Sequence, residues 1–397
     1  MKQKHIILRT TQAATRDPFL GALSQIRTVE SLAAGLSVEV DEIEPRKVST
    51  VTRDSSILAV APAIPMRLVE PVSVKKTVKA AQAQTVAWGV KAVGADTSPF
   101  TGSGVVVAVL DTGIDASHPA FAGVQVIEQD FTGEGNGDQH GHGTHCAGTI
   151  FGRLTGNTRI GVAPGVEKAL IGKVLGQNGG GSSDQIVSAI QWAGQNGANV
   201  ISMSLGMDFP GFVKQLIGQG YPAELATSYA LEGYRANVQL FERLASLIRI
   251  QGSFAQATVI VAAAGNESQR NVDPNFEISV SPPAVAEGIV SVAALGESAQ
   301  GLTVAYFSNT GANISGPGVN ILSAKPGGGF AQMSGTSMAT PHVAGVAALW
   351  AEKIMKTGLL TPATLSAKLI ASGTETGLIT GFDPADVGTG MARAPQV

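Results

Sequence analysis

Five short apolar runs, each of a length suited to one strand and separated by helical patterns, dominate the middle of the chain. Side chains that are apolar on both faces suit strands that are buried on both sides, as in a parallel sheet covered by helices. The sequence therefore predicts an α/β fold with a mainly parallel sheet between helices. The runs are Val105–Leu110, Ala169–Leu175, Val200–Leu205, Val259–Ala264 and Ile289–Ala294, and the clearest helices are Asp184–Ala193 and Val343–Met355.

Composition narrows the class of protein. A chain of 397 residues is long for one domain, so we expect one large core plus a smaller unit. The formal net charge of −3 gives no basic surface for nucleic acid or an anionic membrane, and no apolar run is long enough to span a bilayer. A single cysteine excludes an intramolecular disulfide and a cysteine-based zinc cluster. We expect a monomer with no nucleic-acid or membrane partner.

The N-terminal stretch Met1–Arg9 is basic, but its apolar part is too short for a secretory signal. The sequence as given therefore predicts an intracellular protein, or a secreted one whose signal has been removed.

Three blocks of residues suggest nucleophilic catalysis. Asp111 ends the first apolar run, His142 lies in Gly-His-Gly-Thr-His, and Ser337 lies in Gly-Thr-Ser-Met-Ala-Thr-Pro-His. A serine needs a base to take its proton, and a carboxylate can orient that base. The order Asp, His, Ser differs from the Ser, Asp, His order of α/β-hydrolases. The serine motif also has Ala339 in place of the last glycine of G-x-S-x-G.

Local sequence supports each role. A carboxylate at the end of an apolar strand is costly unless it is paired, and a histidine N–H would pair Asp111. Ser337 precedes a helical pattern with Pro341 near its start, so the serine is expected at a helix N-terminus, where a developing oxyanion is favoured. Taken alone, Ser337 would be interpreted as a helix-capping residue.

Two alternatives concern neighbouring residues. His140, His142 and His145 could together bind zinc, although they lack the spacing and the glutamate of H-E-x-x-H. Asp115 is a rival to Asp111, but it lies in a turn-like segment, which favours a structural role.

A fourth block places Asn266 directly after the run Val259–Ala264, with Gly265 between them. An asparagine at that position can direct its amide into a cleft at the carboxyl end of the sheet. The alternative is an ordinary turn asparagine.

These four blocks resemble the subtilisin-like serine peptidases, and the resemblance covers about Ala83 to Met391. It implies a three-layer subtilisin-like fold, polypeptide substrates and no cofactor for catalysis. It also implies that His142 is the catalytic histidine. Asn266 would then donate to the oxyanion beside the Ser337 backbone N–H.

The resemblance further implies a peptide-binding cleft. Two strand edges would clamp an extended substrate by β-augmentation, and small residues near Asn266 would line an apolar side-chain pocket. Glu267 at the rim of that pocket could accept a basic group. The residues are Ser204, Leu205 and Gly206 for one edge, Lys173, Leu175 and Gly176, with Gly179 to Gly181 after them, for the other, and Ala263, Gly265 and Glu267 for the pocket.

The predicted domain organisation has three parts. Residues 1–70 form a small propeptide-like α+β unit, which includes a weak helix at Phe19–Ile26. Residues 71–82 form a linker, and residues 83–397 form the catalytic domain with an insertion at about 208–249 beside the cleft. We expect the N-terminal unit to chaperone folding and inhibit the enzyme. We expect self-cleavage within Lys79–Gln84, so that the mature protein begins near Ala83.

Cysteine and calcium complete the comparison with the family. Cys146 follows His145, as in the thiol-containing branch, and we expect it to be a buried filler near His142. Gln84 matches one ligand of the family's strong calcium site, but Ala120 replaces the expected aspartate and the loop carries Arg153 and Arg159. Structural calcium at that site is therefore doubtful.

Two other functions remain open on this fold. The same acyl-enzyme could react with an amine, which would make the protein a peptide cyclase or ligase. The second is a peptide-binding protein without catalytic activity. The presence of the aspartate, histidine, serine and asparagine of all four blocks argues against it.

Overall fold

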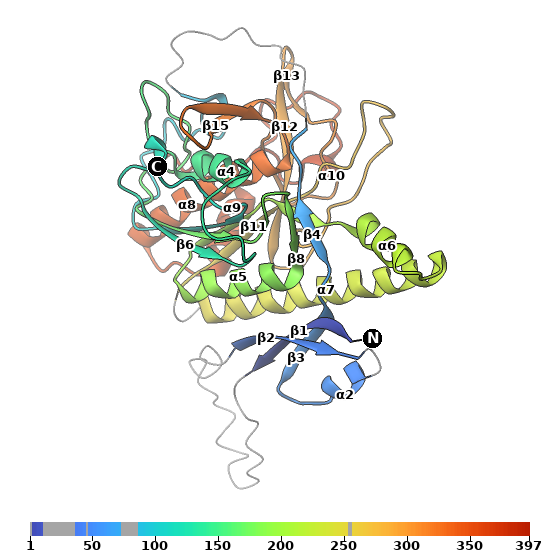
Figure 1. The fold of residues 1–397 in the computed structure, drawn as a ribbon. Coiled ribbons are helices and arrows are strands. Elements are labelled where there is room, and N and C mark those ends of the chain that lie inside the picture. Colours follow the sequence, from blue (N-terminus) through green and yellow to red (C-terminus); the bar gives the residue numbers. More distant parts are fainter. Residues whose placement is uncertain (1, 11–35, 45–46, 73–85, 253–255) are drawn as a thin grey trace, which may run out of the picture.

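The computed structural model describes residues 2–10, 36–44, 47–72, 86–252 and 256–397 (Figure 1). Its centre is a twisted sheet in the order β13-β12-β11-β9-β5-β7-β6, with β14 beside β12. Its pairs are parallel except β12 with β13, so the mainly parallel sheet is confirmed. The strands are β5 (Val106–Asp111), β6 (Gln125–Asp130), β7 (Lys168–Lys173), β9 (Val200–Met203), β11 (Val259–Ala263), β12 (Ile289–Ser298), β13 (Gly301–Val304) and β14 (Ile314–Pro317).

Helices cover both faces of this sheet, which gives the expected three layers. In β5, Val107 and Val109 are buried in the core shared with α4 (His142–Phe151) and α8 (Thr336–Thr357). The alternate residues Ala108 and Leu110 belong to the opposite core, shared with α5 (Ser183–Gln195) and α7 (Ala223–Gly252). Because strand side chains alternate between faces, a continuously apolar run is what this double burial requires.

The remaining elements between residues 86 and 397 are short or peripheral. They are α3 (Trp88–Ala92), η2 (Pro119–Phe121), β8 (Gly180–Ser182), β10 (Leu205–Met207), α6 (Phe209–Gly218), β15 (Ile321–Ala324), β16 (Phe330–Met333), α9 (Pro362–Ala371) and α10 (Pro384–Val387). No helix in the described part of the chain is both long and apolar enough to cross a membrane.

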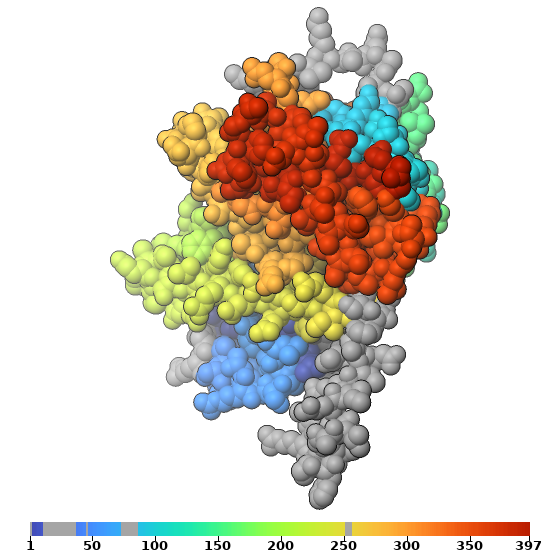
Figure 2. Space-filling view, turned by 180° about the vertical axis from the view of Figure 1, so that it is seen from behind, coloured from blue at the N-terminus to red at the C-terminus, as the bar shows by residue number. Residues whose placement is uncertain are grey.

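The N-terminal unit is an antiparallel sheet in the order β2-β1-β3, formed by β1 (Gln3–Thr10), β2 (Leu36–Ile43) and β3 (Ile57–Pro62), with the short helix α2 (Val48–Val51). It lies against α7, which separates it from the central sheet (Figures 1 and 2). Asn237 on α7 donates from Nδ2 to the Pro62 carbonyl at 2.9 Å. Lys4 forms an ion pair of 2.6 Å with Asp184 on α5. The predicted helix at Phe19–Ile26 lies outside the described residues.

The segment predicted as an insertion, about 208–249, forms α6 and most of α7. The start of α6 lies beside the cleft, where Asp208 pairs with Arg67. The amphipathic stretch predicted over Tyr234–Ile248 is helical, and its buried side chains fill the core between the sheet and the N-terminal unit. This part of the segment is therefore a structural layer and not a surface excursion. Its most deeply buried apolar side chains are Leu240, Phe241, Leu244 and Ala245.

Candidate active site

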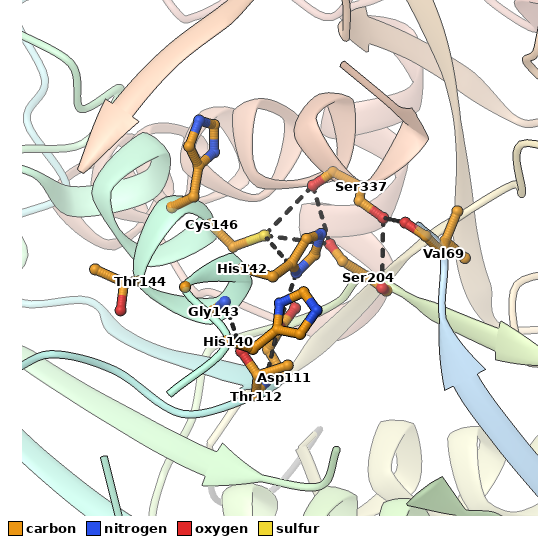
Figure 3. A network of polar contacts seen from close by, with 12 residues as sticks. Val69, Asp111, Thr112, His140, His142, Gly143, Thr144, Cys146, Ser204 and Ser337 are labelled. Carbon is orange, nitrogen blue, oxygen red and sulfur yellow. Dashed lines mark hydrogen bonds and ion pairs between the residues drawn. The ribbon is translucent and has the colours of Figure 1, made fainter. Parts of the chain in front are cut away.

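Asp111 and His142 meet where the sheet contacts α4. Asp111 is the last residue of β5 and His142 the first of α4, and His142 Nδ1 lies 2.8 Å from Asp111 Oδ1 (Figure 3). Both side chains are buried. Burial, the largest single effect, lowers the pKa of His142, but the Asp111 charge together with Cys146 and the hydrogen bonds to both residues raises it well above its usual value. The two residues are paired as the sequence predicted.

The close approach of α4 to the end of β5 depends on the glycine after His142. A Cβ atom at Gly143 would lie 2.1 Å from the Gly113 carbonyl oxygen, so a larger residue would push the helix away. The Gly143 N–H instead donates to Thr112 Oγ1 at 2.9 Å.

Sequence reasoning missed Asp138, a buried carboxylate that connects these two elements. Its Oδ1 accepts from Thr112 Oγ1 at 2.9 Å and from the backbone of His140 and Gly141 at 3.1 and 2.7 Å. Its Oδ2 accepts from Thr144 N and Oγ1 at 2.9 and 2.6 Å. Burial raises its pKa, but the hydrogen bonds, led by that from Thr144, lower it overall. An aspartate in a glycine-rich loop is common in turns, so sequence offered no distinguishing signal.

Ser337 is the second residue of α8 and points at another part of the same chain. Its Oγ donates to the Val69 carbonyl oxygen at 2.8 Å, and the Ser204 carbonyl oxygen lies at 3.4 Å (Figure 3). His142 Nε2 has no hydrogen-bond partner among the described residues. The expected contact between serine and histidine is therefore not formed in this arrangement, because the serine hydroxyl is engaged by the segment in the cleft.

Pro341 has a different consequence from the one predicted. It lies beyond the first turn of α8, where it removes the N–H that would bond the Ser337 carbonyl. That carbonyl accepts instead from Ser204 Oγ at 3.1 Å and Cys146 Sγ at 3.5 Å. The proline thus frees a backbone acceptor that joins α8 to β10 and α4.

Asn266 follows β11 and has its amide fixed in orientation. Gly265 before it adopts a φ of 115°, a conformation that favours glycine. Asn266 Oδ1 accepts from Thr336 N and Oγ1, each at 2.9 Å, so Nδ2 faces the cleft. Nδ2 donates to the Glu70 carbonyl oxygen at 2.9 Å.

An extended segment of the chain itself occupies the cleft. β4 (Pro65–Leu68) pairs antiparallel with β8 on one side and β10 on the other. Beyond it, Val69 N lies 3.4 Å from the Ser204 carbonyl oxygen, and Leu68 N donates to the Gly179 carbonyl oxygen at 2.8 Å. Clamping of a strand between two edges was predicted, and the strand seated there comes from residues 65–70.

One predicted edge lies as expected and the other does so only in part. Leu205 and Gly206 pair with Leu68 and Arg67, directly after Ser204. Lys173 is instead the buried end of β7, where its Nζ donates to the Thr112 carbonyl oxygen at 2.9 Å. The glycines predicted after it do form the second edge, since Gly180 and Gly181 of β8 pair with β4, whereas the assignment of Lys173–Gly176 to that edge was wrong. Leu175 and Gly176 support the turn through a bridge from Leu175 to Gly181 and a 2.8 Å bond from Gly176 N to the Gly180 carbonyl.

The pocket residues predicted around Asn266 occupy different environments. Ala263 is fully buried at the end of β11, and Gly265 N donates to Thr336 Oγ1 at 3.2 Å. Glu267 is at the rim, where its Oε2 accepts from Asn309 Nδ2 at 2.7 Å and its Oε1 lies 3.9 Å from Arg67 Nη2.

The two histidines beside His142 do not converge on a common ligand position. His145 Nε2 lies 3.0 and 3.2 Å from the carbonyl oxygens of Ile321 and Ala331, and burial lowers its pKa to about 3. The His140 ring packs edge-on against His142, with ring centroids 6.3 Å apart. The arrangement does not favour the zinc alternative.

Asp115 and Cys146 behave as predicted. Asp115 accepts from Ser117 Oγ at 2.5 Å and from Gly327 N at 2.8 Å, which is a loop-bracing role. Cys146 is buried with Sγ 3.7 Å from His142 Nδ1, and burial raises the pKa of its thiol.

One group of potential metal ligands is found among the described residues, and it coincides with this site. It consists of Asp111, His142 and Cys146, whose ligand atoms lie within 4.8 Å of one another.

Gln84, the predicted calcium ligand, lies outside the described residues. Two other residues considered for that calcium site are described. Ala120 is buried, and Arg159 Nη2 donates to the carbonyl oxygens of Ala95 and Val162 at 2.9 and 3.2 Å.

Comparison with known proteins agrees with this geometry. Residues 102–385 match the model of the subtilase family. The chain belongs to the subtilase family. It is 37% identical over 280 residues to Subtilisin Savinase of Lederbergia lenta, which covers 68% of this chain and 86% of the relative. The same identity and length hold for M-protease of Shouchella clausii, of which this subtilase spans 61%. Subtilisin DY of Bacillus licheniformis is 34% identical over 276 residues, covering 67% of this subtilase and 85% of the relative.

Proposed function

We propose that this subtilase is a serine endopeptidase that hydrolyses peptide bonds of polypeptides through an acyl-enzyme. The main support is the position of Ser337 Oγ, 2.8 Å from a carbonyl oxygen of a strand bound like a substrate between β8 and β10. The other two groups are already paired, since His142 Nδ1 lies 2.8 Å from Asp111 Oδ1. These side chains are the nucleophile, base and orienting carboxylate that a triad needs.

The chemistry follows from these roles. Ser337 attacks the carbonyl carbon while His142 takes its proton and later gives it to the leaving amine. Asp111 holds the tautomer and stabilises the imidazolium. Asn266 Nδ2, whose direction Thr336 fixes and which here donates to the Glu70 carbonyl oxygen, would donate to the oxyanion of a peptide whose scissile carbonyl occupies that position. The residues present supply every proton transfer, so the proposed reaction needs no cofactor.

We further propose that the chain is a zymogen. Residues 1–70 would inhibit by filling the cleft, with 71–82 as the linker to the catalytic domain of 83–397. The predicted cut within Lys79–Gln84 lies outside the described residues, whereas the Val69 carbonyl faces Ser337. The Val69–Glu70 bond is therefore a second candidate for the first cut, although Asn266 Nδ2 binds the next carbonyl, that of Glu70. N-terminal sequencing distinguishes a chain beginning at Glu70 from one beginning near Ala83, and an intact active chain would contradict the zymogen proposal.

The function is tested by incubating the purified protein with a peptide library and a fluorophosphonate probe, with Ser337→Ala as control. We expect hydrolysis and labelling at Ser337, both lost in the variant. Products without an added water would indicate transamidation. A folded protein freed of residues 1–70 that neither labels nor cleaves would support a silent binding protein.

The proposal includes no calcium at the family's strong site. Arg159 donates to backbone carbonyls in this loop and Ala120 supplies no oxygen from its side chain, which disfavours a cation there.

A further inference from the structure

The strand in the cleft displays its side chains in alternation. Met66 and Leu68 are each only 1% exposed, whereas Arg67 between them is exposed and faces away from the core. Main-chain pairing on both sides holds this register, with Arg67 opposite Gly206 on β10 and Gly180 on β8. A peptide bound in the same way would place its own residue at the position of Arg67.

Two carboxylates from different elements flank the Arg67 guanidinium. Asp208, which precedes α6, has Oδ1 3.5 Å from Arg67 Nη1. Glu267, in the loop after β11, has Oε1 3.9 Å from Arg67 Nη2. The guanidinium therefore lies between two negative charges that approach it from separate parts of the catalytic domain.

Both carboxylates are held independently of Arg67. Asp208 caps α6 by accepting from Gly211 N at 3.0 Å. Glu267 is fixed by Asn309, which donates to its Oε2 at 2.7 Å and accepts from its N–H at 3.0 Å. Because these bonds do not involve residues 65–70, the negative pair is expected to remain when that strand leaves the cleft.

We propose that Asp208 and Glu267 form a subsite for a basic side chain at the third residue before the cleaved bond. This inference rests on the proposed peptidase function and on Val69 as the residue whose carbonyl Ser337 attacks. Its substrates are then peptides with Arg or Lys at that position, followed by apolar residues like Leu68 and Val69. The strand of residues 65–70 occupies the cleft because it presents this same pattern.

The test uses processed protein and peptides of sequence Pro-Met-X-Leu-Val-Glu-Ala-Val, with cleavage read by mass spectrometry. X is arginine, its neutral isostere citrulline, or glutamate. Because partly exposed ion pairs are weak, we expect kcat/KM for arginine to exceed that for citrulline by roughly threefold to tenfold, with glutamate lowest. In the double variant Asp208→Asn/Glu267→Gln, which keeps the capping oxygen and the Asn309 bond, the ratio should fall to about one. The control Glu297→Gln, at an exposed position of the β12–β13 hairpin, should keep the wild-type ratio.

A second measurement does not depend on hydrolysis. In the full-length Ser337→Ala protein, Arg67→Glu should speed hydrogen exchange of the β4 amides by roughly threefold to tenfold. Arg67→Glu combined with Glu267→Arg should reverse part of this change. Cleavage of all peptides at equal rates would overturn the subsite and leave the peptidase function standing. Absence of cleavage of any peptide would count against the function, and the subsite would then stand or fall with the exchange result.

Discussion

Replacing Asp138 is the most informative perturbation of the site, because this side chain acts only through its neighbours. In Asp138→Asn the Oδ1 acceptor can be kept, but the Oδ2 position becomes an NH₂ group that faces the N–H of Thr144. A buried N–H left without an acceptor costs about 1–3 kcal/mol, and hydrogen bonds to a charged group contribute about 1.5–3 kcal/mol each. We therefore expect Asp138→Asn to lower the free energy of unfolding by about 2–4 kcal/mol. Asp138→Ala should cost more, because every donor to the carboxylate loses its acceptor.

The same change should slow catalysis. Asp138 holds Thr112 Oγ1, which accepts from Gly143 N beside His142, so its loss loosens the register of α4 against β5. Since small displacements of catalytic groups can cost up to about 10²-fold, we expect kcat to fall roughly tenfold to a hundredfold with a smaller change in KM.

Unfolding by urea in the Ser337→Ala background avoids self-digestion and gives the stability change. Asp273→Asn is the matched control, since Asp273 is an exposed carboxylate that caps a turn by accepting from Asn275 N at 2.8 Å. The pKa of Asp138 is lowered in the folded state. The stability that its ionised carboxylate adds to the fold is therefore fully present above the unfolded pKa of about 3.9, and it is lost as pH falls through the folded pKa. Wild type and Asp138→Asn should therefore converge in stability at acid pH. A stability change no larger than that of the control at pH 7 would refute the role given to this carboxylate.

Three further predictions concern the catalytic groups. Asp111→Asn should fold normally but lower kcat by roughly 10⁴-fold, because the wrong His142 tautomer is favoured; wild-type turnover would contradict the triad. Asn266→Ala should lose kcat with little change in KM, and in subtilisin itself, a member of the same family, loss of this type of donor costs about 10²–10³; a dominant KM effect would mean that Asn266 positions substrate. The pKa of His142 is raised in the folded state, so its pairing stabilises full-length Ser337→Ala below about pH 6.5 and that stability is lost as pH rises through the folded pKa. Thermal melting from pH 6 to 10 should show this decline, with a flatter profile after Asp111→Asn, and a constant melting temperature in both proteins would argue against it.

Local patterns in the sequence predicted most of what the catalytic groups need. Apolar runs and turn residues placed Asp111 and Asn266 at the ends of strands, and the glycines around His142 indicated a close approach. These features depend on a few neighbouring residues, since strand and helix periodicities are short. The resemblance to a family then assigned roles to groups whose spatial meeting no local pattern could show.

The tertiary structure decided which distant segments meet. Periodicity cannot distinguish the buried end of a sheet strand from a cleft edge, so Lys173 was assigned to the edge that the later glycines Gly180 and Gly181 form. Asp138 was missed because its importance comes from hydrogen bonds to two elements that only packing brings together.

The strand in the cleft also shows what local sequence predicts and what only the tertiary structure decides. The sequence of residues 57–69 is typical of a β-strand, and the chemistry of Ser337 follows from its motif. That the carbonyl of Val69 lies against Ser337, which is 268 residues away along the chain, depends on the packing of β3 against α7. Strand propensity is a local property, whereas its partner is selected by the burial of apolar surface and main-chain hydrogen bonds across the whole molecule.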